Sequence, residues 1–415
     1  MGKFLKVISV FFVLCLIFIP GLYADEISGL KEQIKKVQSE NKLLQEKLNK
    51  QQEVIDTLVK KVDNLQAPSL QKIPEPEMPE ESGEFEIPKL TLKGFADFEY
   101  QAKLTGSEDH NTFSLGEVDF FVTSKISEKV DFLTEFEFHP EADTNVADFH
   151  LERANIKYEA ADYLNIKVGE MHTALGYWNQ EFHHGSWLQT TINRPEIYKW
   201  EDDTGGFLPL HAIGIYLFGT HELNNFDLEY DLGVLNGRGK ERHEIQNMDD
   251  KNNFKALSLS LSVKPDIIEG LSVGAVFYYD EIPENPSTAS RAKQIDEFII
   301  GENIVYKYEN LELLAEFFNI FHDDKTSGKD YDTFGFYAQA GYKIDKITPY
   351  YRFDYIDFEQ TNPYFTPYDI DIQKHTAGIR WDIFTWNALK FEYSYSDKKT
   401  QENEQSVTIN TSFAF

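Results

Sequence analysis

The chain ends in the stretch SVTINTSFAF, residues 406–415, whose side chains alternate between two kinds. Val407, Ile409, Phe413 and Phe415 share one face of an extended strand, and most of the intervening residues are small or polar. Because successive side chains of a strand point to opposite faces, one face suits lipid and the other suits water. Lipid cannot pair a free backbone group, so a sheet crosses a bilayer only when it closes on itself. The stretch predicts the last strand of a transmembrane β-barrel.

Similar alternating stretches recur from residue 90 onward, and we count sixteen of them between 90–102 and 406–415. An even number is what bacterial single-chain barrels have. The predicted fold class is therefore all-β, a 16-stranded antiparallel transmembrane β-barrel, preceded by an N-terminal α-helical coiled coil.

The predicted connections between strands are alternately short and long. Segments such as 127–129 and 159–162 are short, whereas 236–253 and 359–374 are long. Barrels of the outer membrane have short periplasmic turns and longer extracellular loops. This alternation places both ends of the barrel segment on the periplasmic side.

The alternation also predicts which side chains face the interior of the barrel. In the stretch 257–263, leucine and valine alternate with Ser258, Ser260 and Ser262, which indicates a wet lumen. Sixteen strands leave room for an aqueous channel, and charged groups at membrane depth require water. The alternative is a barrel plugged by interior ion pairs. The expected charged lumen wall comprises Lys93, Asp97, Glu99, Glu117, Asp119, Glu135, Glu229, Arg352, Asp354, Arg380 and Asp382.

The longest connection, 173–210, is rich in rings, imidazoles and charges. A connection of this length is usually either functional or disordered, and the many aromatic residues favour a folded loop. We expect it to fold into the lumen and narrow it; the alternative is an outer cap that makes subunit contacts. The expected constriction residues are Tyr177, Trp178, His183, His184, Trp187, Arg194, Trp200, Asp202 and Asp203.

The N-terminal part divides into three segments before the barrel at 90–415. Segment 1–24 has the basic, apolar and small-residue regions of a signal peptide. Segment 25–66 carries an unbroken heptad pattern, with polar layers at Asn41 and Gln51 that set the register. It predicts a periplasmic coiled coil that makes a homo-oligomer, either dimer or trimer; the alternative is a helix that docks on its own barrel. Segment 67–89, rich in Pro and Glu, predicts an extended linker.

Composition excludes several classes of protein. The mean hydropathy of -0.45 argues against a bundle of membrane helices. The net charge of -30 makes nucleic acid an unsuitable partner. The single cysteine, Cys15, lies in the predicted signal peptide, so we expect no disulfide and no thiol chemistry in the mature chain.

The sequence supports catalysis and metal binding less well than it supports a membrane channel. No motif brings a serine, a histidine and an orienting polar group together, so we expect no enzyme activity. Imidazoles and carboxylates could bind a divalent metal in an uptake channel, but their spacing matches no strong motif, and our prediction names no metal and no cofactor. The candidate ligands are His172, His183, His184, His211, Asp202 and Asp203.

The architecture resembles that of bacterial outer-membrane porins, most closely the phosphate-selective porin O and P type. The resemblance covers the signal peptide, coil, linker and sixteen strands, with YDLGVLNG at 230–237 and the terminal Phe415 as the most similar stretches. It implies homotrimers in the outer membrane, passive diffusion of small hydrophilic solutes, and recognition of Phe415 by the barrel assembly machinery.

The charge of the interior departs from the phosphate-selective type. A phosphate channel needs a ladder of Arg and Lys to replace the hydration of the anion, whereas the predicted inward faces hold more Asp and Glu. We therefore expect a cation-leaning or sugar-permeable porin. The other reading is a plugged structural barrel that tethers the outer membrane through its coiled coil.

Overall fold

The computed structural model describes residues 88–415, apart from a few short segments. The predicted signal peptide, the coiled coil with Asn41 and Gln51, and all of the linker before residue 88 lie outside the described residues. The structural statements below concern the described part of the chain. Its internal gaps are 106–110, 142–145, 184, 200–205, 245–247, 360, 367–370 and 400.

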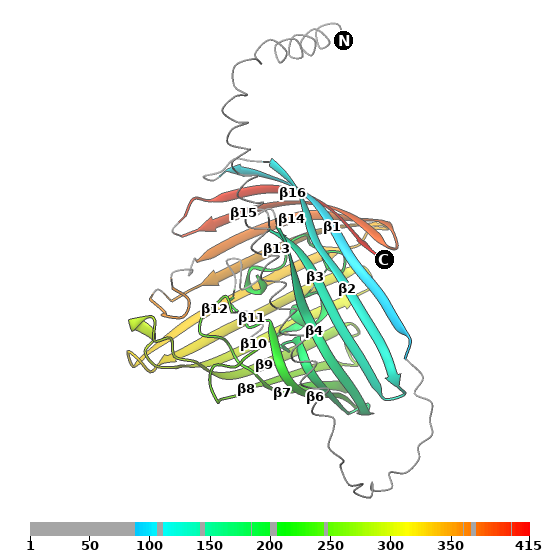
Figure 1. Cartoon of the computed structure of the whole chain (residues 1–415). Coiled ribbons are helices and arrows are strands. Elements are labelled where there is room, and N and C mark those ends of the chain that lie inside the picture. Colours follow the sequence, from blue (N-terminus) through cyan, green and yellow to red (C-terminus); the bar gives the residue numbers. More distant parts are fainter. Residues whose placement is uncertain are drawn as a thin grey trace, which may run out of the picture. The chain divides into compact units, whose positions relative to one another are not determined.

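Sixteen strands in the described residues form one closed antiparallel barrel, which confirms the predicted fold class of the barrel segment. Each strand pairs with its neighbours in sequence, and β1 pairs with β16, as the blue and red ends of Figure 1 show. The strands are β1 Leu90–Thr105, β2 Asn111–Ser127, β3 Val130–Glu141, β4 Val146–Ala161, β5 Leu164–His172, β6 His211–Leu223, β7 Phe226–Leu235, β8 Ala256–Pro265, β9 Leu271–Ile282, β10 Ile295–Tyr308, β11 Leu311–Asp324, β12 Lys329–Tyr342, β13 Ile347–Asp357, β14 Ile372–Phe384, β15 Asn387–Lys398 and β16 Glu404–Ala414.

The barrel closes where the final strand meets the first. Ala96 lies opposite Phe413, and Gly94 and Phe415 exchange two backbone hydrogen bonds of 2.9 and 3.0 Å. A Cβ at Gly94 would lie 2.5 Å from the carbonyl oxygen of Asp119, so this close approach requires glycine. Closure pairs the backbone of both terminal strands and leaves no sheet edge between them.

The outward face of the barrel is apolar and the inward face is polar. Leu257 is exposed while Ser258 is buried, and Phe391 is exposed while its neighbours Lys390 and Glu392 are buried. This distribution is the reverse of that in a water-soluble protein, where charged side chains are almost never fully buried unless paired. It follows from the dyad alternation, because neighbouring residues of each strand point to opposite sides of the wall.

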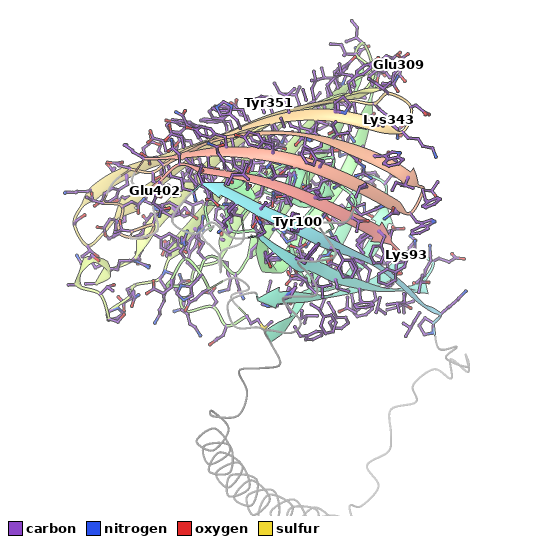
Figure 2. The ribbon with its side chains drawn as sticks, turned by 90° about the horizontal axis from the view of Figure 1, so that it is seen from above. Lys93, Tyr100, Glu309, Lys343, Tyr351 and Glu402 are labelled. Atoms are coloured by element: carbon purple, nitrogen blue, oxygen red, sulfur yellow. The ribbon has the colours of Figure 1, made fainter. Side chains whose placement is uncertain are left out.

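The four longest connections all lie at the same end of the barrel, as predicted. Glu309, in the turn between β10 and β11, and Lys343, between β12 and β13, lie at one end in Figure 2, whereas Glu402, between β15 and β16, lies at the other. The long connections 236–255 and 358–371 join odd strands to even ones and therefore share the end of Glu402.

Among the described residues of the long connections there are three short helices, and the sequence pattern indicated none of them. α3 Tyr177–Glu181 and η1 Glu196–Tyr198 belong to loop 173–210, and η2 Ala289–Arg291 lies between β9 and β10. No helix in the described part of the chain is long and apolar enough to cross a membrane.

Candidate functional site

Loop 173–210 packs against the inward-facing side chains of β11 to β15. Its own core is aromatic: the indole of Trp178 stacks on the ring of Tyr198 with centroids 5.2 Å apart. Tyr198 also contacts Phe318 of β11 and Tyr337 of β12, edge to face. These rings are all buried, so the loop is a folded part of the barrel interior.

Glu316 on β11 is the first anchor of the loop. Its carboxylate accepts hydrogen bonds from the backbone N–H groups of Tyr177 and Trp178, at 2.7 and 2.8 Å, where α3 begins. It also accepts 2.8 Å hydrogen bonds from the hydroxyls of Tyr198 and Tyr337. Four donors around one buried carboxylate offset its desolvation and hold α3 against the wall.

A second anchor lies on β13. The guanidinium of Arg352 pairs with Asp354 at 2.9 Å and donates to the backbone carbonyls of Asn193 and Arg194 at 2.7 and 3.0 Å. The carboxylate of Asp354 accepts a 3.0 Å hydrogen bond from the backbone N–H of Glu196. Both charged side chains are fully buried beneath the loop.

A third anchor lies on β15. The ammonium of Lys390 donates to the carbonyls of Gln189 and Thr191 at 2.8 and 2.7 Å. The adjacent inward carboxylate, Glu392, accepts from the backbone N–H of Ile192 at 2.9 Å and from the amide of Asn193 at 3.0 Å. One cation thus binds loop carbonyls while one anion binds loop N–H groups, which matches both polarities of the peptide backbone.

Glu196, at the start of η1, pairs with two lysines. Its carboxylate lies 2.7 Å from the ammonium of Lys374 on β14 and 2.8 Å from that of Lys199. Burial by itself would raise the pKa of Glu196, but the two ammonium groups outweigh it and hold the pKa below its ordinary value. The loop therefore carries an ionised carboxylate at this contact.

The end of the loop is joined to a neighbouring connection. Arg238, in segment 236–255, pairs with Glu297 of β10 at 2.9 Å and donates to the backbone carbonyls of Gly206 and Phe207 at 2.9 and 2.6 Å. Coulomb attraction to the Glu297 carboxylate outweighs burial and raises the pKa of Arg238 above its ordinary value. Two of the long connections are therefore bound to each other inside the barrel.

Between loop 173–210 and the wall formed by β1, β2 and β14 to β16 lies a polar cavity of about 420 Å³. Asp97, Glu99 and Glu117 line one side, and Arg194 and His183 from the loop line the other. The guanidinium of Arg194 lies 3.1 Å from Glu117, so opposite charges meet across the cavity. A second cation of the loop, Lys199, also lines it.

A second cavity, of about 710 Å³, lies toward the end with the short turns. Six carboxylates and only two ammonium groups line it. Tyr177 and Gln180 of α3 also line this cavity, so the loop has a polar space on each of two sides. The charged lining is Glu181, Asp227, Glu229, Asp231, Asp266, Glu269, Lys264 and Lys307.

The other predicted site residues have varied surroundings. Asp119 and Glu135 are buried, with Glu135 paired to Arg153. Lys93 is exposed near the end with the short turns. Trp187 stacks on Phe95 at 5.7 Å. Three contacts of the remaining charged residues are Glu229 with Lys264 at 2.6 Å, Arg380 with Asp382 at 2.7 Å, and Arg380 with the carbonyl of Trp187 at 2.7 Å.

Four of the predicted constriction residues cannot be placed, and several important residues were not predicted. His184, Trp200, Asp202 and Asp203 lie outside the described residues. Glu316, Lys374 and the pair of Arg238 with Glu297 are loop anchors that the sequence analysis missed. Alternation along β11 would have shown that Glu316 faces inward, but no sequence signal indicates that the start of α3 binds it.

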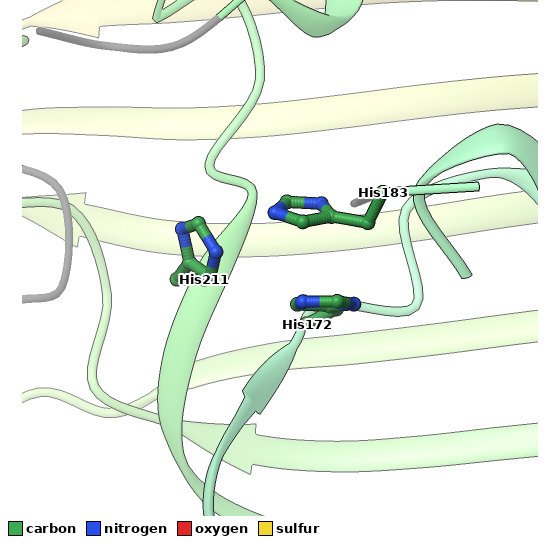
Figure 3. A group of neighbouring side chains, drawn as sticks. All are labelled: His172, His183 and His211. Carbon is green, nitrogen blue, oxygen red and sulfur yellow. The ribbon is translucent and has the colours of Figure 1, made fainter. Parts of the chain in front are cut away.

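The structure also brings together three of the candidate metal ligands, His172, His183 and His211. His172 ends β5 and His211 begins β6, so they flank loop 173–210, while His183 belongs to the loop. Figure 3 shows the three rings grouped at this point.

Comparisons with known proteins show the fold class. The chain is similar to the anion-selective porin from Comamonas acidovorans, with 13% identity, 79% of this chain and 100% of that chain covered, and a TM-score of 0.57. It is similar to the outer membrane channel DcaP of Acinetobacter baumannii, with 12% identity, coverage of 79% and 97%, and a TM-score of 0.55. It is also similar to the trimer form of OmpT from Vibrio cholerae, with 11% identity, 80% of this chain and 100% of that chain covered, and a TM-score of 0.54.

The comparison with family models gives no match, and that with curated proteins gives none either. At these identities the solved structures establish the porin barrel as the fold and leave function to be argued from the residues.

Proposed function

We propose that the protein is an outer-membrane porin through which small hydrophilic solutes diffuse passively. The observation that carries the proposal is loop 173–210, which is bound to the inner wall at Glu316, Arg352 and Lys390 and borders a polar cavity on each of two sides. A loop of this kind narrows a wide barrel without filling it. The fold of the solved porins and the apolar outer face support the same conclusion.

The proposed selectivity is for cations over anions. Six carboxylates against two lysines line the cavity near the short turns, and a low-dielectric wall strengthens their attraction for counter-ions. The architecture resembles the phosphate-selective porin O and P type, but a phosphate ion entering this cavity meets net repulsion. Sugars are a weaker alternative, because Trp178 is buried against Tyr198 and Trp187 stacks on Phe95.

Location and assembly form part of the same proposal. The signal peptide directs export, Phe415 serves the barrel assembly machinery, and the coiled coil joins dimers or trimers in the periplasm. The similar OmpT structure, which is a trimer form, supports a trimer over a dimer. Enzyme activity is not proposed, because no motif in the sequence brings a serine, a histidine and an orienting polar group together.

Planar-bilayer recordings test the proposal. We expect single-channel currents from the purified protein and a reversal potential in a KCl gradient that shows preference for K⁺. Replacing the three neighbouring carboxylates of β7, with Asp227→Asn, Glu229→Gln and Asp231→Asn, should shift the reversal potential toward zero, because half of the acidic lining loses its charge.

The matched control removes three carboxylates from turns outside this cavity, with Glu128→Gln, Glu309→Gln and Asp345→Asn. It should leave the reversal potential unchanged. A silent wild-type protein at every salt concentration would contradict the channel and favour the plugged structural barrel. An anion-selective current would instead contradict only the proposed selectivity.

A further inference from the structure

Three histidines meet where loop 173–210 leaves and re-enters the barrel wall. His172 and His211 are directly opposite each other in the pairing of β5 with β6. His183 follows α3 and stacks on His172 with ring centroids 3.7 Å apart, while its ring meets that of His211 edge to face at 4.5 Å. Figure 3 shows the two parallel rings with the third beside them.

The spacing of the three imidazoles is close to that of a metal site. One ring nitrogen from each histidine lies within 4.8 Å of the others. Zinc binds imidazole nitrogen at about 2.0–2.1 Å, so the three ligands of one ion lie within about 3.5 Å of one another. Binding therefore requires the rings to turn so that their nitrogens converge on one point.

Polar groups lie close to each of the three rings. The carboxylate of Glu152 lies 2.8 Å from Nε2 of His211, the Asn179 side-chain oxygen hydrogen-bonds to Nδ1 of His183, and Glu135 lies 3.9 Å from Nε2 of His172. A ligating histidine usually engages a carboxylate or carbonyl through its second nitrogen, which sets the orientation of the ring.

The charge around the cluster favours a cation. Glu135, Glu152 and Glu170 are all buried on β3, β4 and β5 beside the histidines. Glu135 pairs with Arg153, and Glu152 lies 2.8 Å from the imidazole of His211. Carboxylates this close to the three imidazoles attract a cation, and a divalent ion would bring two positive charges to this point.

From these observations we propose that His172, His183 and His211 bind one divalent transition-metal ion, with Zn²⁺ as the test ion, and that the ion fastens loop 173–210 to the barrel. Three imidazoles suit Zn²⁺ and its first-row neighbours. Because His183 also lines the cavity beside β1 and β2, the site borders that cavity. The effect on conductance rests on the proposed porin function, whereas binding itself does not.

Metal binding is measured directly on the full-length protein in detergent. The protein is stripped with a chelator, incubated with Zn²⁺, desalted and assayed for metal content. We expect one equivalent per chain in the wild type, with X-ray absorption showing imidazole ligands at about 2.0–2.1 Å. His183→Gln should abolish retention, and Glu152→Gln should weaken affinity by about 10–100-fold.

The matched control is His221→Gln, which alters a histidine of β6 that lies outside the cluster. It should bind as the wild type does. His183→Cys, which keeps a ligating atom in the loop, should restore retention. Equal zinc content in the wild type and His183→Gln, or none in the wild type, overturns the proposal.

Conductance provides a separate readout. Micromolar Zn²⁺ should change the single-channel current of the wild type and of His221→Gln, but not that of His183→Gln. If zinc binds with the predicted ligands and no current is ever seen, the metal site stands and the porin function fails. If current is seen but zinc is not retained, the porin function stands and the metal site fails.

Discussion

Individual buried charges connect loop 173–210 to the barrel, and each is matched to the backbone groups that it meets. Lys390 binds carbonyls, Glu316 binds N–H groups, and Arg352 binds carbonyls while paired with Asp354. Hydrogen bonds to charged groups contribute about 1.5–3 kcal/mol each, and removing one partner leaves the other unsatisfied. Single substitutions at these residues should therefore affect the loop more than the barrel.

Glu316→Gln should loosen the start of α3. The neutral amide offers one acceptor oxygen in place of two, so at least one of the four donors loses its partner, at a cost of about 1–3 kcal/mol. We expect faster proteolysis within 173–210 and a larger, noisier single-channel current. Limited proteolysis with mass spectrometry measures the first effect and bilayer recording the second.

The control is Glu302→Gln, an exposed residue of the neighbouring β10. It should match the wild type in both assays. Identical cleavage and conductance in Glu316→Gln and the wild type would show that the loop does not depend on this carboxylate.

Loop 173–210 is attached to the barrel by both apolar packing and polar contacts. Tyr198 packs on Tyr337, and Phe207 packs on Phe358. Its polar attachments are ion pairs and charge-assisted hydrogen bonds, such as Glu196 with Lys374. The barrel strands, in contrast, are held by continuous backbone ladders, so conditions that weaken ion pairs should release the loop before the barrel unfolds.

The pH dependence of loop attachment follows from Glu196. Its pKa in the folded protein lies below the ordinary value of 4.5, so its ion pairs contribute fully above that value and are lost as the pH falls through the folded pKa. The contribution of Glu196 to the protection of the loop from a protease active in acid should therefore be the same at pH 7 and pH 5 and decline only at lower pH.

Glu196→Gln separates this residue from the other carboxylates. The variant should be less protected than the wild type at pH 7, and the difference between them should shrink as the pH falls below 4.5. A constant difference down to the lowest pH at which the barrel remains folded would mean that the charge of Glu196 contributes nothing to attachment.

The whole molecule combines a barrel that pairs its own backbone completely with an N-terminal segment predicted to associate with other copies. Closure between β1 and β16 makes the barrel independent of neighbours for its hydrogen bonds. The predicted coiled-coil segment, in contrast, depends on another chain, because its narrow apolar stripe is buried only against a partner helix. Folding of the barrel and oligomerisation should therefore be separable.

Deletion of residues 25–66 from the mature chain should leave a folded barrel with an altered oligomer. We expect unchanged β-sheet circular dichroism and unchanged current per channel, with a smaller species after chemical crosslinking. A double substitution of the polar layers, Asn41→Leu with Gln51→Leu, should keep the chains associated but make the helix register or the number of subunits less well defined. An identical crosslinked pattern with and without 25–66 would place the subunit contacts in the barrel.

Much of the barrel could be predicted from sequence, whereas little of the site could. Alternation indicated sixteen strands, and it marked the inward faces of β13, where Arg352 and Asp354 lie. It could not indicate that a loop covers these two residues, or that α3 begins at a carboxylate 139 residues away in Glu316. No spacing motif indicated that His183 meets His172 and His211.

The sequence by itself determined the strand count, the two faces of each strand and the alternation of short and long connections, because a period of two residues is a local property of an extended chain. Only the tertiary structure decided which wall residues border cavities and which bind loop 173–210. Those contacts join residues more than a hundred positions apart, and closing the barrel is what brings them within hydrogen-bonding distance.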